Sequence, residues 1–130
     1  MKLKRGEYHS LLFKAKHLAY NRLLIGIPMT GLVRAEWALA RYSQVIPCNW
    51  SHSDFIQWMN QMTPLSYSVA EARNVIVDEA VKGNFEWLLF IDHDVILPPD
   101  CFVTLNQYML RGKIPVVTGL YYAKCHPPEP

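Results

Sequence analysis

Short apolar runs of strand length alternate along this chain with segments whose apolar residues recur at helical spacing. In α/β proteins this alternation builds a mainly parallel sheet, because each helix carries the chain back to the edge where the next strand begins. We therefore predict an α/β fold of alternating βα units, with a mainly parallel sheet and helices on both of its faces. Strands are expected at 23–27, 55–62, 85–91 and 114–122, and helices at 33–45, 69–82 and 98–110.

The segment 69–82 carries the clearest helix signal. Ser68 precedes it and Glu71 follows three residues later, which is the spacing of a capping box. Gly83 is the matching stop signal. The next segment, 85–91 (FEWLLFI), is an almost continuous apolar run. Such a run predicts a strand that is covered on both faces.

Composition and charge narrow the classes of protein to which the chain can belong. Hydrophobic residues make up 51% of the 130 residues and charged residues only 18%, which excludes a disordered chain and a long coiled coil. The formal net charge of +2 is far below that of a protein that binds the phosphates of nucleic acids, so no nucleic acid partner is expected. No apolar run approaches the roughly 20 residues of a transmembrane helix. We therefore expect no membrane span.

The two ends of the sequence differ from its middle. Basic residues dominate 1–22, which we interpret as a basic N-terminal extension, and the proline-rich end 127–130 is typical of a linker or a truncation point. The domain between them is expected to span 23–126. The three cysteines form no Cys-x-x-Cys pair, and the first residues hold no apolar signal-peptide core. These features predict a reduced, cytoplasmic setting.

Asp92, His93 and Asp94 come directly after the apolar run 85–91. Parallel α/β sheets bind ligands at the carboxyl ends of their strands, so a ligand is expected here. Two carboxylates two residues apart can turn toward one hard cation and leave its other positions to phosphate oxygens and water. Such a cation offsets the charge of a departing diphosphate. The alternative is that the two aspartates only solvate the strand end or cap the next turn.

Five short motifs follow one another between about residue 23 and residue 128. They are Ile27-Pro28, Ala72-Arg73-Asn74, Trp87–Ile91 leading into Asp92-His93-Asp94, Leu97–Asp100 and Val117–Tyr122. Together and in this order they resemble the nucleotide-sugar-dependent glycosyltransferases of the GT-A fold, especially the family 2-like group. The resemblance implies a Rossmann-like nucleotide-binding half, a sugar donor linked to UDP or GDP, and an Mn²⁺ or Mg²⁺ ion on the Asp-x-Asp motif. It also implies transfer of the sugar to an acceptor, whose identity the motifs do not indicate.

The resemblance, carried over by position, implies a set of site residues. Asp92 would lie near the ribose of the donor or the metal, and Asp94 would be a direct metal ligand. Arg73 and Asn74 would face the nucleotide, since a guanidinium and an amide in the first turns of a helix supply donors to phosphate oxygens. Pro28 and Thr30, in the loop after the first strand, would lie against the base and ribose.

The chain departs from the family beyond its last expected strand. The family's catalytic base and a later metal ligand lie there, in the acceptor-binding half, whereas this sequence stops at Pro130. We therefore expect a donor-binding half with no catalytic residue assigned, and self-association or completion by a further chain. A non-catalytic nucleotide-binding or assembly module, or a truncated remnant, remains an alternative. A further alternative takes Asp92 to Val95 as the nucleophile motif of haloacid dehalogenase-like phosphatases.

Overall fold

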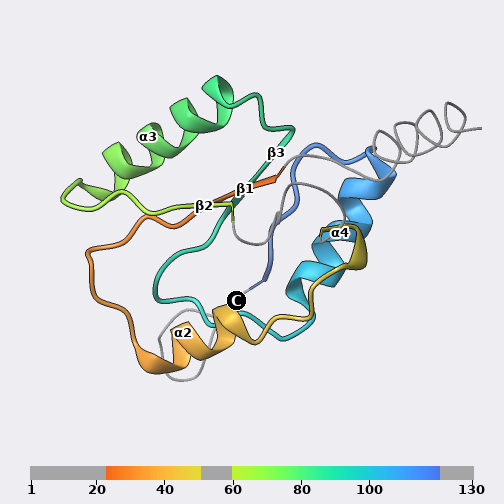
Figure 1. Cartoon of the computed structure of the whole chain (residues 1–130), viewed down its shortest axis with the longest axis horizontal. Coiled ribbons are helices and arrows are strands. Elements are labelled where there is room, and N and C mark those ends of the chain that lie inside the picture. Colours follow the sequence, from red (N-terminus) through yellow and green to blue (C-terminus); the bar gives the residue numbers. More distant parts are fainter. Residues whose placement is uncertain (1–22, 51–59, 121–130) are drawn as a thin grey trace, which may run out of the picture.

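The computed structural model describes residues 23–50 and 60–120. Strands and helices alternate along this part of the chain, which confirms the mixed α/β class (Figure 1). The predicted extensions, 1–22 and 127–130, lie outside the described residues. In chain order the elements are β1 (Leu23–Gly26), α2 (Ala35–Tyr42), the short 3₁₀ helix η1 (Cys48–Trp50), β2 (Gln61–Met62), α3 (Val69–Lys82), β3 (Trp87–Phe90) and α4 (Cys101–Arg111).

Within the described residues, β1 is the central strand of a three-stranded parallel sheet with the order β2-β1-β3. Gly26 at the end of β1 pairs with Met62 of β2 on one side and with Phe90 of β3 on the other. Since all three strands run in one direction, their carboxyl ends meet at one edge. The N–H of Ile91 donates to the oxygen of Gly26 at 3.0 Å, so Asp92 follows just beyond that edge.

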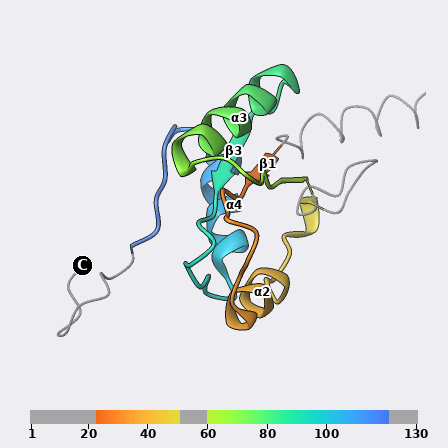
Figure 2. The ribbon, with the colours of Figure 1, turned by 90° about the vertical axis from the view of Figure 1, so that its left-hand side faces the viewer.

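The side chains of β1 alternate between two cores, one on each face of the sheet. Ile25 lies in the larger core, with Trp37 of α2 and Phe102 of α4. Leu24 lies in the smaller core, with Ile76 of α3. Helices therefore cover both faces of the sheet, as predicted, and Figure 2 shows α3 on one side of the strands and α2 on the other.

Helix α3 has the bounds and the N-terminal cap that its sequence predicts. The Ser68 hydroxyl accepts the N–H of Glu71 at 3.3 Å, and the Glu71 carboxylate accepts the N–H of Ser68 at 3.0 Å. This capping box satisfies backbone donors that the first turn leaves without intrahelical partners. The helix also packs closely on β1, because a Cβ placed on Gly26 would collide with Ile76.

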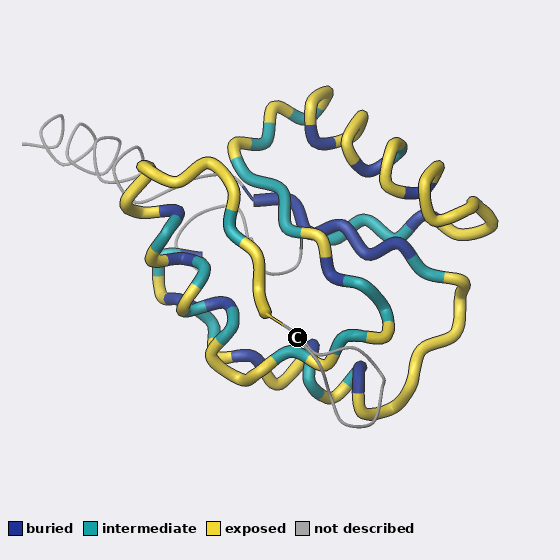
Figure 3. Tube along the Cα trace, turned by 180° about the vertical axis from the view of Figure 1, so that it is seen from behind, coloured by how far each residue is buried: buried dark blue, intermediate teal, exposed yellow. Residues whose placement is uncertain are grey.

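Strand β3 packs on both faces of the sheet, as predicted, with Trp87 and Leu89 against the larger core and Leu88 against the smaller one, but it is only partly buried. Its first three residues are half-buried, and Phe90 at its end is 38% exposed. Its partial exposure follows from its position at the side of the sheet: in the described part of the chain β3 pairs only with β1, and the fully buried strand is β1 (Figure 3).

Two further predicted elements differ from the structure. The helix expected over 33–45 spans only Ala35–Tyr42, since the N–H of Val45 bonds instead to the oxygen of Pro99, ahead of α4. The last strand is absent from the described residues: 114–120 join no strand and are mostly exposed (Figure 3), while 121 and 122 lie outside. An apolar run forms a strand only where a neighbouring strand supplies its hydrogen bonds.

Of the strand expected over 55–62, residues 60–62 fall in the described part, and Gln61–Met62 form β2. No helix among the described residues combines the length and the apolar character needed to cross a membrane.

Candidate functional site

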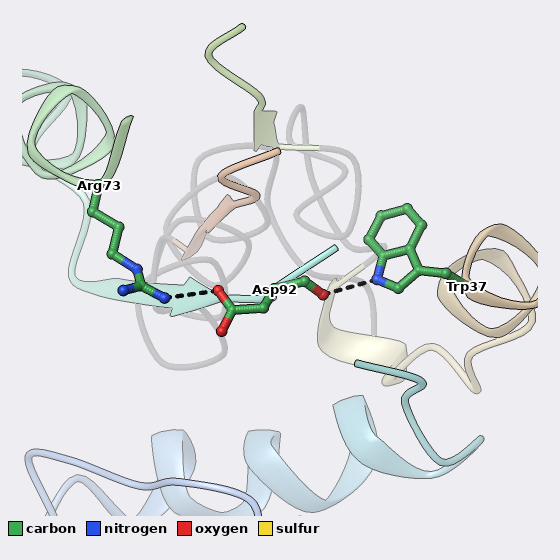
Figure 4. Close-up of polar contacts among 3 residues, drawn as sticks. All are labelled: Trp37, Arg73 and Asp92. Carbon is green, nitrogen blue, oxygen red and sulfur yellow. Dashed lines mark hydrogen bonds and ion pairs between the residues drawn. The ribbon is translucent and has the colours of Figure 1, made fainter. Parts of the chain in front are cut away.

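The carboxyl edge of the sheet brings together side chains from three parts of the fold. Asp92 lies two residues beyond the end of β3, Arg73 lies near the N-terminus of α3, and Trp37 lies on α2. Figure 4 shows Arg73 and Trp37 reaching Asp92 from opposite sides. The β2-α3-β3 connection explains the first contact, because the helix after a parallel strand begins at the edge where the strands end.

Arg73 and Asp92 form an ion pair at this edge. The Arg73 Nη2 donates to the Asp92 Oδ1 at 2.9 Å, and their side chains are 46% and 38% exposed. A pair this exposed adds little to stability, since water screens it. Both charged groups therefore remain accessible to a ligand that reaches the edge.

Trp37 fixes the backbone of the same aspartate. Its side chain is only 4% exposed, and its Nε1 donates to the backbone oxygen of Asp92 at 2.9 Å. A buried indole N–H needs an acceptor, so this bond satisfies Trp37 and positions the end of β3 at once. The sequence places Trp37 only on the apolar face of a predicted helix. The one available signal of a polar role was that a buried indole N–H needs a hydrogen-bond acceptor.

Asp92 and Asp94 lie in one turn beyond β3. The N–H of Val95 donates to the Asp92 oxygen at 3.2 Å, and Asp94 is exposed. Among residues 23–50 and 60–120, no group of three or more His, Cys, Asp or Glu side chains gathers around a possible metal. Mg²⁺ is commonly held by one or two carboxylates together with substrate phosphates, so Asp92 and Asp94 are of the residue type that a cation arriving with a diphosphate requires.

The other predicted site residues lie in different surroundings. Pro28 is fully buried, whereas Thr30 two residues later is exposed. Asn74 is exposed on α3, next to Arg73. In the described part of the chain, no hydrogen bond joins Thr30 or Asn74 to the Arg73–Asp92 pair. Of the predicted set, then, the structure brings Arg73 and Asp92 into contact and leaves Thr30 and Asn74 open to solvent.

A cleft of about 550 Å³ opens beside Asp92. Its walls are the end of β3, the segment 95–98, the first turns of α4 and the segment 117–120. No predicted site residue except Asp92 lines it.

The chain matches no protein-family model, no curated protein and no solved structure at a significant level. The residues at the carboxyl edge and the cleft beside them are therefore what point to a function.

Proposed function

We propose that this chain is the donor-binding half of a glycosyltransferase, and that its carboxyl edge binds a nucleoside diphosphate sugar together with Mn²⁺ or Mg²⁺. The observation that carries the proposal is the exposed contact between Arg73 and Asp92, at the edge where parallel sheets bind ligands. A carboxylate offers oxygen to a hard cation, and a guanidinium offers a fork of N–H donors to a phosphate.

The two charges neutralise each other when no ligand is bound, and a metal diphosphate offers each a new partner. Arg73 exchanges the Asp92 carboxylate for phosphate oxygens, and Asp92 exchanges the guanidinium for the cation. Because both side chains are partly exposed, this exchange buries no unpaired charge, which would carry a large penalty. The pair thus keeps the site neutral without blocking it.

The other predicted site residues contact the cation or the nucleoside in this proposal. Asp94 is the second carboxylate toward the cation, and Thr30 and Asn74 supply exposed polar groups toward the nucleoside. In the transfer, the bond between the anomeric carbon and the diphosphate oxygen would break, and a bond to an acceptor hydroxyl or amine would form as that group loses its proton to a base in the acceptor-binding half. The cation offsets charge on the departing diphosphate.

Completion by another chain is part of the proposal. Within the described residues, the outer edge of β3 has no partner strand. An open strand edge favours pairing with a second chain. We expect the protein to self-associate or to pair with an acceptor-binding chain, and sedimentation showing a monomer at high concentration would count against self-association.

Calorimetric titration of UDP and GDP, with and without Mn²⁺, tests the proposed function. We expect Mn²⁺-dependent binding of at least one of them to the wild-type protein, and loss of that binding in Asp94→Ala. The matched control is Asp78→Ala, which removes an exposed aspartate from α3 and should bind as the wild type does. The proposal would be overturned if neither UDP nor GDP bound, or if the nucleotide that binds bound equally well to Asp94→Ala. Phosphate release from an aryl phosphate that disappears in Asp92→Asn would support the phosphatase alternative instead.

A further inference from the structure

The cleft beside Asp92 has the size and the construction of a ligand site. Its volume of about 550 Å³ falls within the range of about 300–1,000 Å³ that small-molecule pockets occupy. Three separate stretches of the chain form it, since side chains beyond β3, on α4 and in the segment 117–120 face one another across it. Asp92 belongs both to this lining and to the ion pair with Arg73.

Most of the lining is apolar. Val95 lies on the β3 side, Leu105 belongs to α4, and Val117 comes from the segment opposite. Walls of this kind bind a hydrocarbon surface, because contact removes apolar area from water. A bare sugar would leave these walls without a matching surface.

The polar groups of the lining are acidic or neutral. Asp92 and Asp100 contribute carboxylates, Thr104 and Tyr108 contribute hydroxyls, and none of the described residues that line the cleft is a lysine, arginine or histidine. An anionic headgroup would meet the carboxylate of Asp100, which no cation among the described lining residues offsets, and that of Asp92, whose charge is balanced only by Arg73 outside the lining. A neutral hydroxyl, in contrast, donates its hydrogen bond to a carboxylate oxygen.

From these observations we infer that the cleft binds a neutral amphipathic molecule, with its hydrocarbon part between Val95, Leu105 and Val117 and a hydroxyl directed to the carboxylates of Asp92 and Asp100. That this molecule is the acceptor of the sugar rests on the proposed function. The shared position of Asp92 supports it, because a hydroxyl bound to Asp92 lies next to the cation that the proposed function assigns to the same residue.

Octyl β-glucoside, below the concentration at which it forms micelles, is a probe of this chemistry. Octyl phosphate has the same chain with an anionic head, and glucose has the head without the chain. We expect saturable binding of octyl β-glucoside, binding at least tenfold weaker for octyl phosphate, and none for glucose. Equal binding of octyl phosphate, or no saturable binding of octyl β-glucoside, would overturn the inference.

Two variants of α4 locate the binding. Thr104 lines the cleft and is exposed, so Thr104→Trp fills the cleft without disturbing the core. Gln107 is exposed on the same helix but does not line the cleft, so Gln107→Trp is the matched control. We expect the affinity for octyl β-glucoside to fall at least tenfold in Thr104→Trp and to be unchanged in Gln107→Trp. Equal affinities in the two variants would place the probe elsewhere and overturn the inference.

Cys101 supplies a second readout, because it lines the cleft and is half-buried. In a Cys48→Ser, Cys125→Ser background, octyl β-glucoside should slow alkylation of Cys101. Titration of UDP and of GDP with Mn²⁺ on the same protein separates the two proposals. If octyl β-glucoside binds and the nucleotides do not, the inference about the cleft is supported and the proposed function is overturned. If the nucleotides bind and octyl β-glucoside does not, the proposed function is supported and the inference about the cleft is overturned.

Discussion

The indole N–H of Trp37 donates to the backbone oxygen of Asp92 at 2.9 Å, across 55 positions of the sequence. Arg73 contacts the carboxylate of the same residue, also at 2.9 Å. Asp92 is therefore held at its backbone by α2 and at its side chain by α3, while that side chain remains 38% exposed. A charged group that is fixed yet accessible binds its ligand with little reorganisation, as binding sites require.

Replacing Trp37 by phenylalanine tests the value of that backbone contact. Trp37→Phe keeps an apolar ring in the core and removes the N–H donor. We expect a loss of about 1–2 kcal/mol in the free energy of unfolding, in the range for removing one partner of a buried hydrogen bond. We also expect several-fold weaker binding of UDP with Mn²⁺, because the end of β3 loses its anchor. Urea unfolding and calorimetric titration measure the two effects.

Trp50→Phe is the matched control for that variant. The Nε1 of Trp50 donates to the Oδ1 of Asn106 at 2.8 Å, and Trp50 lies near Leu23 and Trp87, at the opposite end of the strands from Asp92. Trp50→Phe should lose similar stability and keep its nucleotide affinity. If both variants lost affinity equally, Trp37 would act only through general stability.

Arg73→Gln separates the two parts of the proposed exchange, which are binding of the cation by Asp92 and binding of the phosphate by Arg73. The variant removes the cation that competes for the Asp92 carboxylate, so binding of Mn²⁺ alone should stay the same or strengthen. Binding of UDP with Mn²⁺ should weaken about tenfold or more, since a hydrogen bond to a charged group contributes roughly 1.5–3 kcal/mol. Arg111→Gln, at the exposed end of α4, should change neither. A parallel loss of Mn²⁺ and UDP binding in Arg73→Gln would show that Arg73 supports the site only structurally.

The parts of the fold that the sequence predicted are those with local causes. The cap and the bounds of α3 follow from Ser68, Glu71 and Gly83, whose contacts reach only a few residues away. The alternation of strands and helices, and hence the α/β class, follows from the spacing of apolar residues. The family resemblance implied that Arg73 faces the nucleotide and that Asp92 lies near the ribose or the metal. Their direct contact was not predicted, and the topology of a β2-α3-β3 unit brings it about.

The predictions that failed depend on distant neighbours. The runs 85–91 and 114–122 have similar apolar character, but one forms a strand at the side of β1 while residues 114–120 find no strand to pair with in the described part of the chain. The contact of Trp37 with Asp92 and the burial of Pro28 likewise depend on the assembled sheet. No local pattern encodes which strand becomes the centre.

Strand β1 and helix α3 approach each other closely at Gly26. A Cβ there would collide with the Cγ2 of Ile76 and lie 3.2 Å from its Cδ1. Gly26→Ala should therefore destabilise the fold by about 1–3 kcal/mol, the usual penalty of overpacking. Ile76→Ala removes the obstructing atoms, so Gly26→Ala should be much less harmful in that background. Gly119→Ala, where the added Cβ meets nothing within 4 Å, is the control, and a double-mutant cycle by urea unfolding gives the coupling.

The capping box of α3 makes stability depend on pH in a defined direction. Hydrogen bonds from Ser68 hold the pKa of Glu71 below its ordinary value of 4.5. A depressed carboxyl pKa adds stability above the ordinary value, and that stability is lost as the pH falls through the pKa of the folded state. Ser68→Ala should destabilise the protein by about 1 kcal/mol at neutral pH. The difference between wild type and Ser68→Ala should shrink below pH 4.5, and a constant difference in urea unfolding would contradict the assignment.

Cys101 should react more slowly than Cys48 with iodoacetamide. Burial raises the pKa of the Cys101 thiol above its ordinary value of 9.0, and the negative charge of Asp100 raises it further, whereas Cys48 is exposed. Because the thiolate is the reacting form, a raised pKa lowers the rate at neutral pH. Peptide mass spectrometry of partly alkylated protein gives both rates in one sample.

Asp100→Asn tests the electrostatic part of that effect. The variant should speed alkylation of Cys101 a few-fold and leave Cys48 unchanged, which serves as an internal control. Cys101 should still react more slowly than Cys48, because burial, the larger cause, persists. An unchanged Cys101 rate would mean that the Asp100 carboxylate does not act on this wall of the cleft, and a hydroxyl bound there would then have only Asp92 to accept its hydrogen bond.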